Sequence, residues 1–196
     1  MSIRKTSVAV GVLFIVQMVT AMFGTMQIQE FVDGGPGKAA PTLGVLLMMC
    51  SATAVIGIGL LAYRVLKLIN QRLAIWYPIM RVIEGVVSTA CGIYLLIQLQ
   101  AVPNHMLLVY VPTVIGGLVF TYLLYVSRVV PRFVAVLGLI GYGLLGLGTL
   151  LNFLSVVDLN AEGIALLVPG LLFELLVLPF WLIVKGFKAP RTVAAR

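Results

Sequence analysis

Six apolar runs, each long enough to cross a bilayer, take up nearly the whole of this 196-residue chain. A bilayer core of about 30 Å is crossed by roughly 20 residues of α-helix. The composition agrees, since 62% of the residues are hydrophobic and only 10% are charged, where a soluble domain carries about 25% charged residues. We therefore predict an all-α membrane protein, a bundle of six transmembrane helices forming one domain over residues 1–196. The expected spans are residues 7–28, 43–66, 74–98, 106–126, 133–154 and 164–184.

The basic residues fall almost entirely on one side of these spans, the side that holds both termini. Eleven of the 13 are there: Arg4, Lys5, Arg64, Lys67, Arg72, Arg128, Arg132, Lys185, Lys188, Arg191 and Arg196. The opposite connections contain Lys38 and the acidic residues Glu30, Asp33, Asp158 and Glu162. Because lysine and arginine favour cytoplasmic loops, we expect both termini to be cytoplasmic. Such dispersed charges indicate orientation in the lipid bilayer and argue against nucleic acid as a partner.

The first run allows a second interpretation, because it follows two basic residues as the apolar core of a signal peptide does. Val19, Thr20 and Ala21 would form an acceptable cleavage site. The apolar run extends well past a typical signal core, however. We expect a retained helix.

Three ionisable residues, Arg81, Glu84 and Glu174, lie inside the expected spans. A charge in the hydrocarbon region costs at least about 2.5 kcal/mol, so such residues usually face a partner or a wet interior. Both acids fall near the bilayer midplane when depth is counted at about 1.5 Å per residue. Arg81 can pair with Glu84 at the i, i+3 spacing of one helix, or reach Glu174 on another helix.

Other polar residues recur at helical spacing and predict a polar interior to the bundle. Tyr77 and Ser88 extend the line of Arg81 and Glu84 along the third span, and two more spans contribute Gln17 and Thr113. Three interpretations of this interior stay open. The first is a site that binds or conducts a small solute or a proton, and the second is a structural or regulatory subunit whose ion pairs only hold helices together. The third, which we favour least, is an intramembrane enzyme using the paired carboxylates.

Catalytic, metal and cofactor chemistry have little support in the sequence. His105 is the only histidine, and Cys50 and Cys91 lie in apolar runs without metal-ligand spacing. We assign no catalytic residue and expect no metal or cofactor. The glycines from Gly138 to Gly148 include a GxGxxG pattern, but it lies within an apolar run with no strand before it. These glycines favour close packing of the fifth span against a neighbouring helix, and they allow a homo-oligomer.

Three short motifs give the chain a resemblance to a known family. They are Arg81 with Glu84, the segment Ser127–Arg132 with its Pro-Arg turn, and Glu174 followed by Trp181-Leu-Ile-Val-Lys185-Gly186. With these motifs the chain resembles a bacterial membrane family catalogued as domain of unknown function 4386. The resemblance spans most of the chain and implies a six-helix, multi-pass protein of the bacterial cytoplasmic membrane. It implies no activity.

Overall fold

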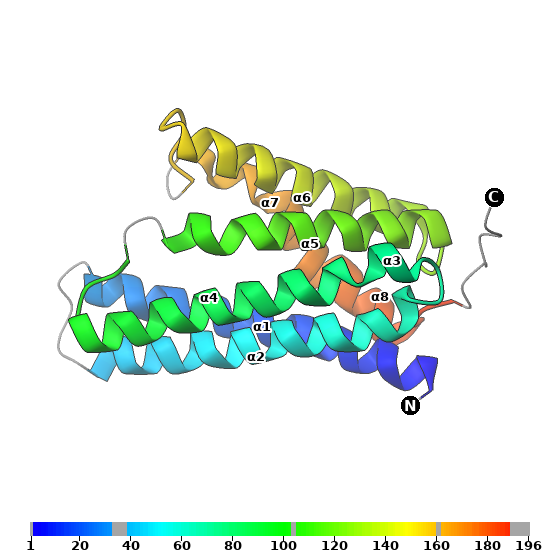
Figure 1. The fold of residues 1–196 in the computed structure, drawn as a ribbon, viewed down its shortest axis with the longest axis horizontal. Coiled ribbons are helices and arrows are strands. Elements are labelled where there is room, and N and C mark those ends of the chain that lie inside the picture. Colours follow the sequence, from blue (N-terminus) through cyan, green and yellow to red (C-terminus); the bar gives the residue numbers. More distant parts are fainter. Residues whose placement is uncertain (1, 33–38, 103–104, 160–161, 189–196) are drawn as a thin grey trace.

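The computed structural model describes residues 2–32, 39–102, 105–159 and 162–188, and every regular element in them is helical. Figure 1 labels the α-helices: α1 Ile3–Val32, α2 Ala39–Leu66, α3 Gln71–Ala74, α4 Trp76–Gln98, α5 His105–Ser127, α6 Arg132–Phe153, α7 Val168–Leu171 and α8 Leu178–Val184. The other elements are the 3₁₀ helix η1 Glu162–Leu166 and the π-helix η2 Leu172–Val177.

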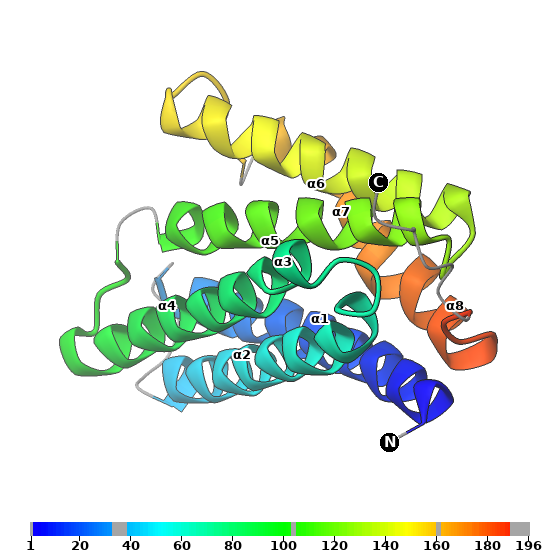
Figure 2. The same ribbon diagram turned by 45° about the vertical axis from the view of Figure 1, so that its right-hand side comes forward.

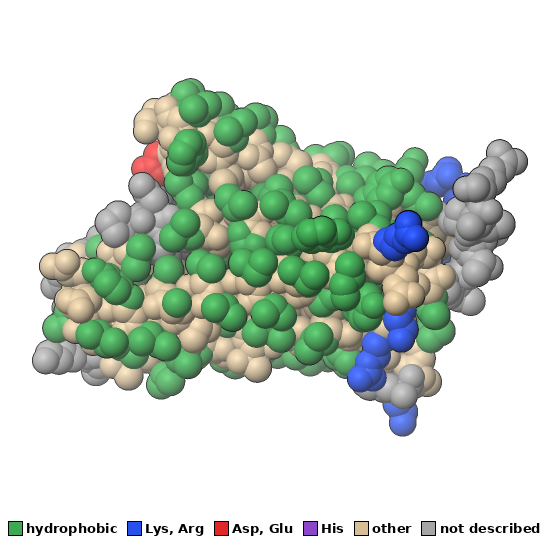
Figure 3. Space-filling view, viewed as in Figure 1, with side chains coloured by type: hydrophobic (Ala, Val, Ile, Leu, Met, Phe, Trp, Pro, Cys, Tyr) green, Lys and Arg blue, Asp and Glu red, His purple; other side chains and the backbone are tan. Residues whose placement is uncertain are grey.

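The predicted membrane character is confirmed, because five helical stretches within the described residues are long and apolar enough to cross a bilayer. They are Ile3–Val32, Pro41–Leu66, Gln71–Gln98, Leu107–Ser127 and Arg132–Phe153. A sixth apolar stretch, Val168–Val184, is helical but shorter. Large hydrophobic side chains cover the flanks of the bundle (Figure 3), and Ile97, Phe133 and Phe153 are each more than 60% exposed. This surface suits contact with lipid acyl chains.

The first five spans lie close to their expected positions. The first two helices begin four residues before the apolar runs, and the next three agree to within two residues at each end, apart from the short α3 that precedes α4. Asn70 explains the separate α3, because its side chain accepts a hydrogen bond from the backbone N–H of Leu73 and caps that helix.

The helices are arranged so that neighbours in the chain are neighbours in space. Each of α1, α2, α4, α5 and α6 packs against the next, and the sixth span returns to α1 through η2 and α8 (Figures 1 and 2). A ring of six segments results. Its interior is therefore lined by residues from segments far apart in the sequence.

The largest group of buried apolar side chains lies in the half of the bundle that holds the chain ends. Phe120 of α5 belongs to this group, stacked on Tyr77 at 4.5 Å between ring centroids and on Phe14 at 6.2 Å. Leu178 and Leu182 of α8 complete this core from the sixth span. The core holds α8 against the start of α1.

The two ends of the described chain meet at the same end of the bundle. Arg4 Nη2 donates to the carbonyl of Ile183 at 2.6 Å, and the backbone N–H of Phe187 donates to Ser7 Oγ at 2.9 Å. The N–H of Lys188 donates to the carbonyl of Val129, in the turn between α5 and α6. Basic side chains gather at this end, and acidic ones appear at the opposite end (Figure 3). Lys38, Asp33, Arg191 and Arg196 lie outside the described residues.

The sixth span differs from the single helix expected over residues 164–184. It is a succession of η1, α7, η2 and α8, with a π-helix where an α-helix would continue. Pro179 has no N–H to donate, and the N–H of Leu178 bonds to the carbonyl of Phe173, five residues back. Pro169 and Pro179 lie on either side of Glu174 and predict a bend near this acid. The structure instead has a π-helical segment, and Glu174 lies within it.

The glycines of α6 pack mainly within the chain. A Cβ placed on Gly141 would lie 2.7 Å from the Cα of Gly170 in α7, so these two backbones touch. At Gly138 and Gly148 the close neighbours are side chains of the same chain, whereas Gly143 has nothing within 4 Å. The glycine face that allowed a homo-oligomer is thus largely used inside the bundle.

Candidate functional site

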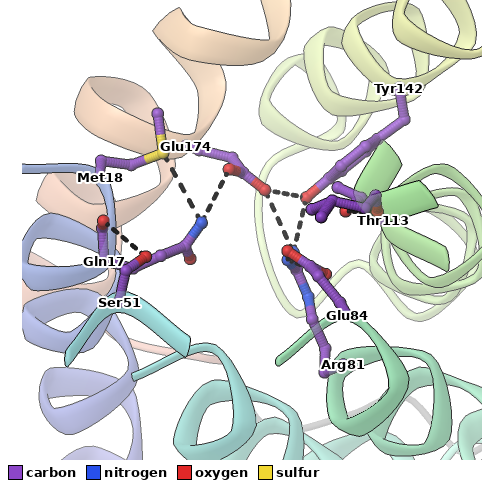
Figure 4. Close-up of polar contacts among 9 residues, drawn as sticks. Gln17, Met18, Ser51, Arg81, Glu84, Thr113, Tyr142 and Glu174 are labelled. Atoms are coloured by element: carbon purple, nitrogen blue, oxygen red, sulfur yellow. Dashed lines mark hydrogen bonds and ion pairs between the residues drawn. The ribbon is translucent and has the colours of Figure 1, made fainter. Parts of the chain in front are cut away.

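Arg81 of α4 is at the centre of a polar cluster in the interior of the bundle. Its Nη1 donates to both oxygens of Glu84, at 3.2 Å and 3.0 Å. Its Nη2 donates to Glu174 Oε1 at 3.1 Å, across to the sixth span (Figure 4). The three charges found within the predicted spans therefore form one unit. Arg81 pairs within its own helix and across the bundle at the same time.

Tyr142 of α6 is a member of this cluster that the sequence analysis did not find. Its hydroxyl accepts from Arg81 Nη2 at 3.0 Å and donates to Glu174 Oε1 (Figure 4). The ring lies against Gly117 of α5, where a Cβ would come within 2.2 Å of a ring carbon. In the sequence, Tyr142 stands between Gly141 and Gly143 in an apolar run, a pattern typical of a residue that only packs against neighbouring helices. One feature of the sequence could have predicted its place in the polar cluster: a tyrosine in the middle of a span has a hydroxyl that needs a polar partner when it is buried.

Gln17 of α1, a predicted member, reaches the same carboxylate from the other side. Its Nε2 donates to Glu174 Oε2 at 3.4 Å. Ser51 Oγ of α2 donates to the backbone carbonyl of Gln17 at 3.1 Å and so ties α2 to this position (Figure 4). We refer to Gln17, Arg81, Glu84, Tyr142 and Glu174 as the buried cluster. Its residues come from four of the six segments in the ring.

Tyr77 and Thr113 lie beside the buried cluster. The Tyr77 ring is fully buried, and the Arg81 guanidinium carbon lies 5.3 Å from its centroid, a cation–π distance. The Thr113 hydroxyl donates to the carbonyl of Val109 at 2.8 Å. The Thr113 side chain lies near Glu84, on the α5 side of the buried cluster (Figure 4). Ser88 is half-buried one turn beyond Glu84, and in the part of the chain that the structure describes no hydrogen bond joins it to the buried cluster.

The charges of the buried cluster are unbalanced, since two carboxylates share one guanidinium. The Arg81 side chain is 0% exposed, while the side chains of Glu84 and Glu174 are 8% and 10% exposed. The acids therefore reach the edge of the packed interior and the arginine does not. Three buried polar atoms here have no hydrogen-bond partner among the residues that the structure describes: Gln17 Oε1, Tyr77 Oη and Arg81 Nε.

The arrangement suits the binding of a very small species. Its members contact one another directly at 3.0 Å to 3.4 Å, so they leave no width for an organic solute between them. Two surface hollows lie elsewhere, one along Arg4 to Leu13 of α1 and one between Phe31 and Ala101. Among the described residues no group of three His, Cys, Asp or Glu side chains could hold a metal ion. Proton exchange at the carboxylates is the chemistry that these contacts permit.

Comparison with known proteins identifies one family. Residues 89–186 match the family described as Domain of unknown function (DUF4386). No curated protein and no solved structure matches the chain. The matched region contains Tyr142, Glu174 and the turn at Val129, whereas Arg81 and Glu84 lie just before it.

Proposed function

The chain belongs to the family described as Domain of unknown function (DUF4386), and we propose that it is a membrane protein whose buried cluster binds a proton and passes it within the bilayer. One observation carries the proposal: Glu84 and Glu174 share the single guanidinium of Arg81 inside an apolar bundle. With both acids ionised the buried cluster would have a net charge of −1.

A net charge in this position is costly. Buried ions lose their hydration, and only a close partner of opposite charge compensates for the loss. Arg81 can neutralise one carboxylate, so the second is neutralised most simply by a proton. The other titratable groups beside the carboxylates, Tyr77 and Tyr142, supply no positive charge. Because the buried cluster holds one proton that it can release, it has the basic property of a proton-binding site.

The distribution of charge supports a definite orientation in the membrane. The described basic side chains gather at the end where the start of α1 meets the end of α8 (Figure 3). The positive-inside rule places this end in the cytoplasm. We propose that the protein lies in the bacterial cytoplasmic membrane with both termini inside. The bilayer is its first partner, and a proton-linked solute would have to bind outside the buried cluster.

A structural role is the second candidate, and the connections of the buried cluster favour it. Hydrogen bonds from Arg81, Gln17 and Tyr142 converge on Glu174 and join α1, α4 and α6 to the sixth span. Such a junction would hold the ring of helices together whether or not a proton moves. The two functions predict different results when the carboxylates are made neutral.

Proton flux into liposomes tests the proposal. The purified full-length chain is reconstituted, a potassium diffusion potential is applied, and internal pH is followed with a trapped dye. We expect faster acidification than in protein-free liposomes. Glu84→Gln and Glu174→Gln should each reduce the rate to the protein-free level while keeping the helical circular dichroism spectrum. The matched control is Glu30→Gln, at an exposed carboxylate near the end of α1, which should keep the wild-type rate.

Two results would contradict proton binding and transfer. The first is a wild-type flux equal to that of protein-free liposomes. The second is an unchanged flux in both glutamine variants combined with a lower unfolding temperature in detergent, which is the outcome expected for a purely structural junction.

A further inference from the structure

The start of α1 has a shallow hollow on its outward surface, which we call the α1 hollow. The described residues that line it all belong to α1: Arg4, Lys5, Val8, Ala9, Val12 and Leu13. α1 packs against α2 on one side and against α8 on the other (Figure 2), so its remaining face is left to the surrounding lipid. On this face Val12 is 45% exposed, and Val8 and Ala9 are half-buried. The α1 hollow therefore has apolar walls and two cations at one end.

The length of the α1 hollow matches one leaflet of a bilayer. The nine positions from Arg4 to Leu13 correspond to about 14 Å of helix at about 1.5 Å per residue. One leaflet supplies about half of a hydrocarbon core of roughly 30 Å. Arg4 and Lys5 lie at the end of the bundle where basic side chains gather (Figure 3), and Leu13 lies deeper. A phospholipid with its headgroup beside the two cations would lay part of one acyl chain along the apolar walls.

The chain supplies no acidic residue to pair with Arg4 and Lys5. Four of its six acidic residues fall between the first and second or the fifth and sixth predicted spans, and the other two belong to the buried cluster. Among the residues that the structure describes, the salt bridges are the two made by Arg81. A lipid phosphate is the anion that a membrane offers to cations at headgroup level. The charge at the end of the α1 hollow therefore complements an anionic lipid.

Arg4 is held beside the α1 hollow by the end of the sixth span. Its Nη2 donates to the carbonyl of Ile183 at 2.6 Å, and its Nη1 lies 3.0 Å from the position that a Cβ on Gly186 would take. A guanidinium has five N–H donors, so this contact leaves others for a second acceptor. Lys5 follows directly in the sequence, and its side chain is exposed. One phosphate group can therefore contact both side chains.

We propose that the α1 hollow binds one anionic phospholipid, with the phosphate beside Arg4 and Lys5 and one acyl chain along Val8, Ala9 and Val12. A zwitterionic lipid fits the same apolar walls, but the cation of its headgroup offsets the attraction to the two basic side chains. Because Arg4 also contacts the end of α8, the bound lipid supports the place where the first and sixth spans meet. This site lies apart from the buried cluster and does not depend on proton transfer.

Native mass spectrometry of the full-length chain tests the charge of the site. The protein is released from mixed micelles that contain equal amounts of phosphatidylglycerol and phosphatidylcholine with identical acyl chains. We expect the fraction that retains one phosphatidylglycerol to be several-fold larger than the fraction that retains one phosphatidylcholine. Lys5→Ala should lower phosphatidylglycerol retention about fivefold, the effect of one basic residue at an anionic membrane surface. The matched control, Lys67→Ala, removes an exposed lysine outside the α1 hollow and should keep the wild-type retention.

A second pair of variants tests the apolar walls without changing any charge. Ala9→Leu places three more carbon atoms in the α1 hollow and should lower phosphatidylglycerol retention to the level of phosphatidylcholine. Ala90→Leu adds the same atoms at an exposed position of α4 and should change neither value. If the leucine variant at Ala9 does not fold, Ala9→Val fills the α1 hollow with a smaller side chain.

Four results would overturn the proposal. The first is equal retention of the two lipids by the wild type, and the second is an equal loss in Lys5→Ala and Lys67→Ala, which would indicate only a general surface charge. The third is unchanged retention in the variant that fills the α1 hollow, or displacement of the lipid by glycerol phosphate at the same concentration, because either would mean that the acyl chain is not bound there. The fourth is a lipid-free dimer that Ala9→Leu dissociates, which would assign the face to a second copy of the chain.

Discussion

The two acids of the buried cluster are carried by very different segments. Glu84 lies on α4, an uninterrupted helix over Trp76–Gln98, held against α2 where a Cβ on Gly85 would lie 3.2 Å from the carbonyl of Ala52. Glu174 lies on η2, a π-helix between α7 and α8. A regular helix sets the height and direction of a side chain through its own backbone. In the π segment the backbone pattern itself is changed to bring the carboxylate to its partners.

This difference shows how a short span can present a charge to distant partners. The π pattern changes which way Glu174 faces relative to α8, and the backbone groups of the segment still find partners, as they must in lipid. The donors that gather around Glu174 then hold it in place. Both oxygens of Glu84 accept from a single nitrogen, Arg81 Nη1. The two acids that share Arg81 are therefore presented by a regular helix and by an irregular segment.

The largest effect is expected from Arg81, because it serves both acids. Arg81→Met leaves two buried carboxylates without a cation and should lower the free energy of unfolding by about 3–5 kcal/mol, or prevent folding. Arg81→Lys keeps the charge but not the forked geometry, so its loss should be smaller. SDS unfolding in mixed micelles, followed by circular dichroism, measures both. Equal stability of the methionine variant and the wild type would mean that Arg81 is not the link between the two segments.

A smaller effect, confined to the Glu174 side, is expected at Gly117. In Gly117→Ala the new methyl group would overlap the Tyr142 ring, move its hydroxyl away from Glu174 and cost about 1–3 kcal/mol. Gly143→Ala is the matched control on α6, because nothing lies within 4 Å of its Cβ position. It should change the free energy of unfolding by no more than about 0.5 kcal/mol. If both variants are equally stable in the same unfolding assay, the Tyr142 packing described here is wrong.

The smallest effect on stability is expected at Pro179. A change there tests directly whether Glu174 depends on the π-helix η2, as the comparison with the regular helix α4 implies. Pro179→Ala returns a backbone N–H to the sixth span and favours a regular α-helix, so the free energy of unfolding should change by about 1 kcal/mol or less. Glu174 should turn away from Arg81, and proton flux in liposomes should fall. Pro169→Ala, at the start of α7 where proline is tolerated, should retain the flux. Unchanged flux in the Pro179 variant would show that the π segment is not needed to place Glu174.

Much of the fold can be predicted from local properties of the sequence. Only some of the residues in the buried cluster can be predicted in the same way. Arg81, Glu84 and Glu174 stand out because charges are rare in apolar spans, and Gln17 was expected from helical spacing. Tyr142 was missed because it lies in an apolar, glycine-rich run. Periodicity grouped Ser88 with Glu84 because they share a helix face, but a shared face does not decide which neighbouring helix meets each residue.

The amino-acid sequence by itself determines that the chain spans a membrane, where its apolar segments begin and end, and which charges lie within them. Those properties depend on transfer free energies added along short stretches of chain, so no neighbouring segment is needed to read them. Only the tertiary structure decides that Arg81 serves both acids, that Tyr142 and Gln17 complete the environment of Glu174, and that the sixth span contains a π-helix. Arg81 and Glu174 are 93 residues apart, and Gln17 and Glu174 are 157 apart. Their contacts depend on how each helix is rotated and how closely it packs, which the whole ring of helices sets together.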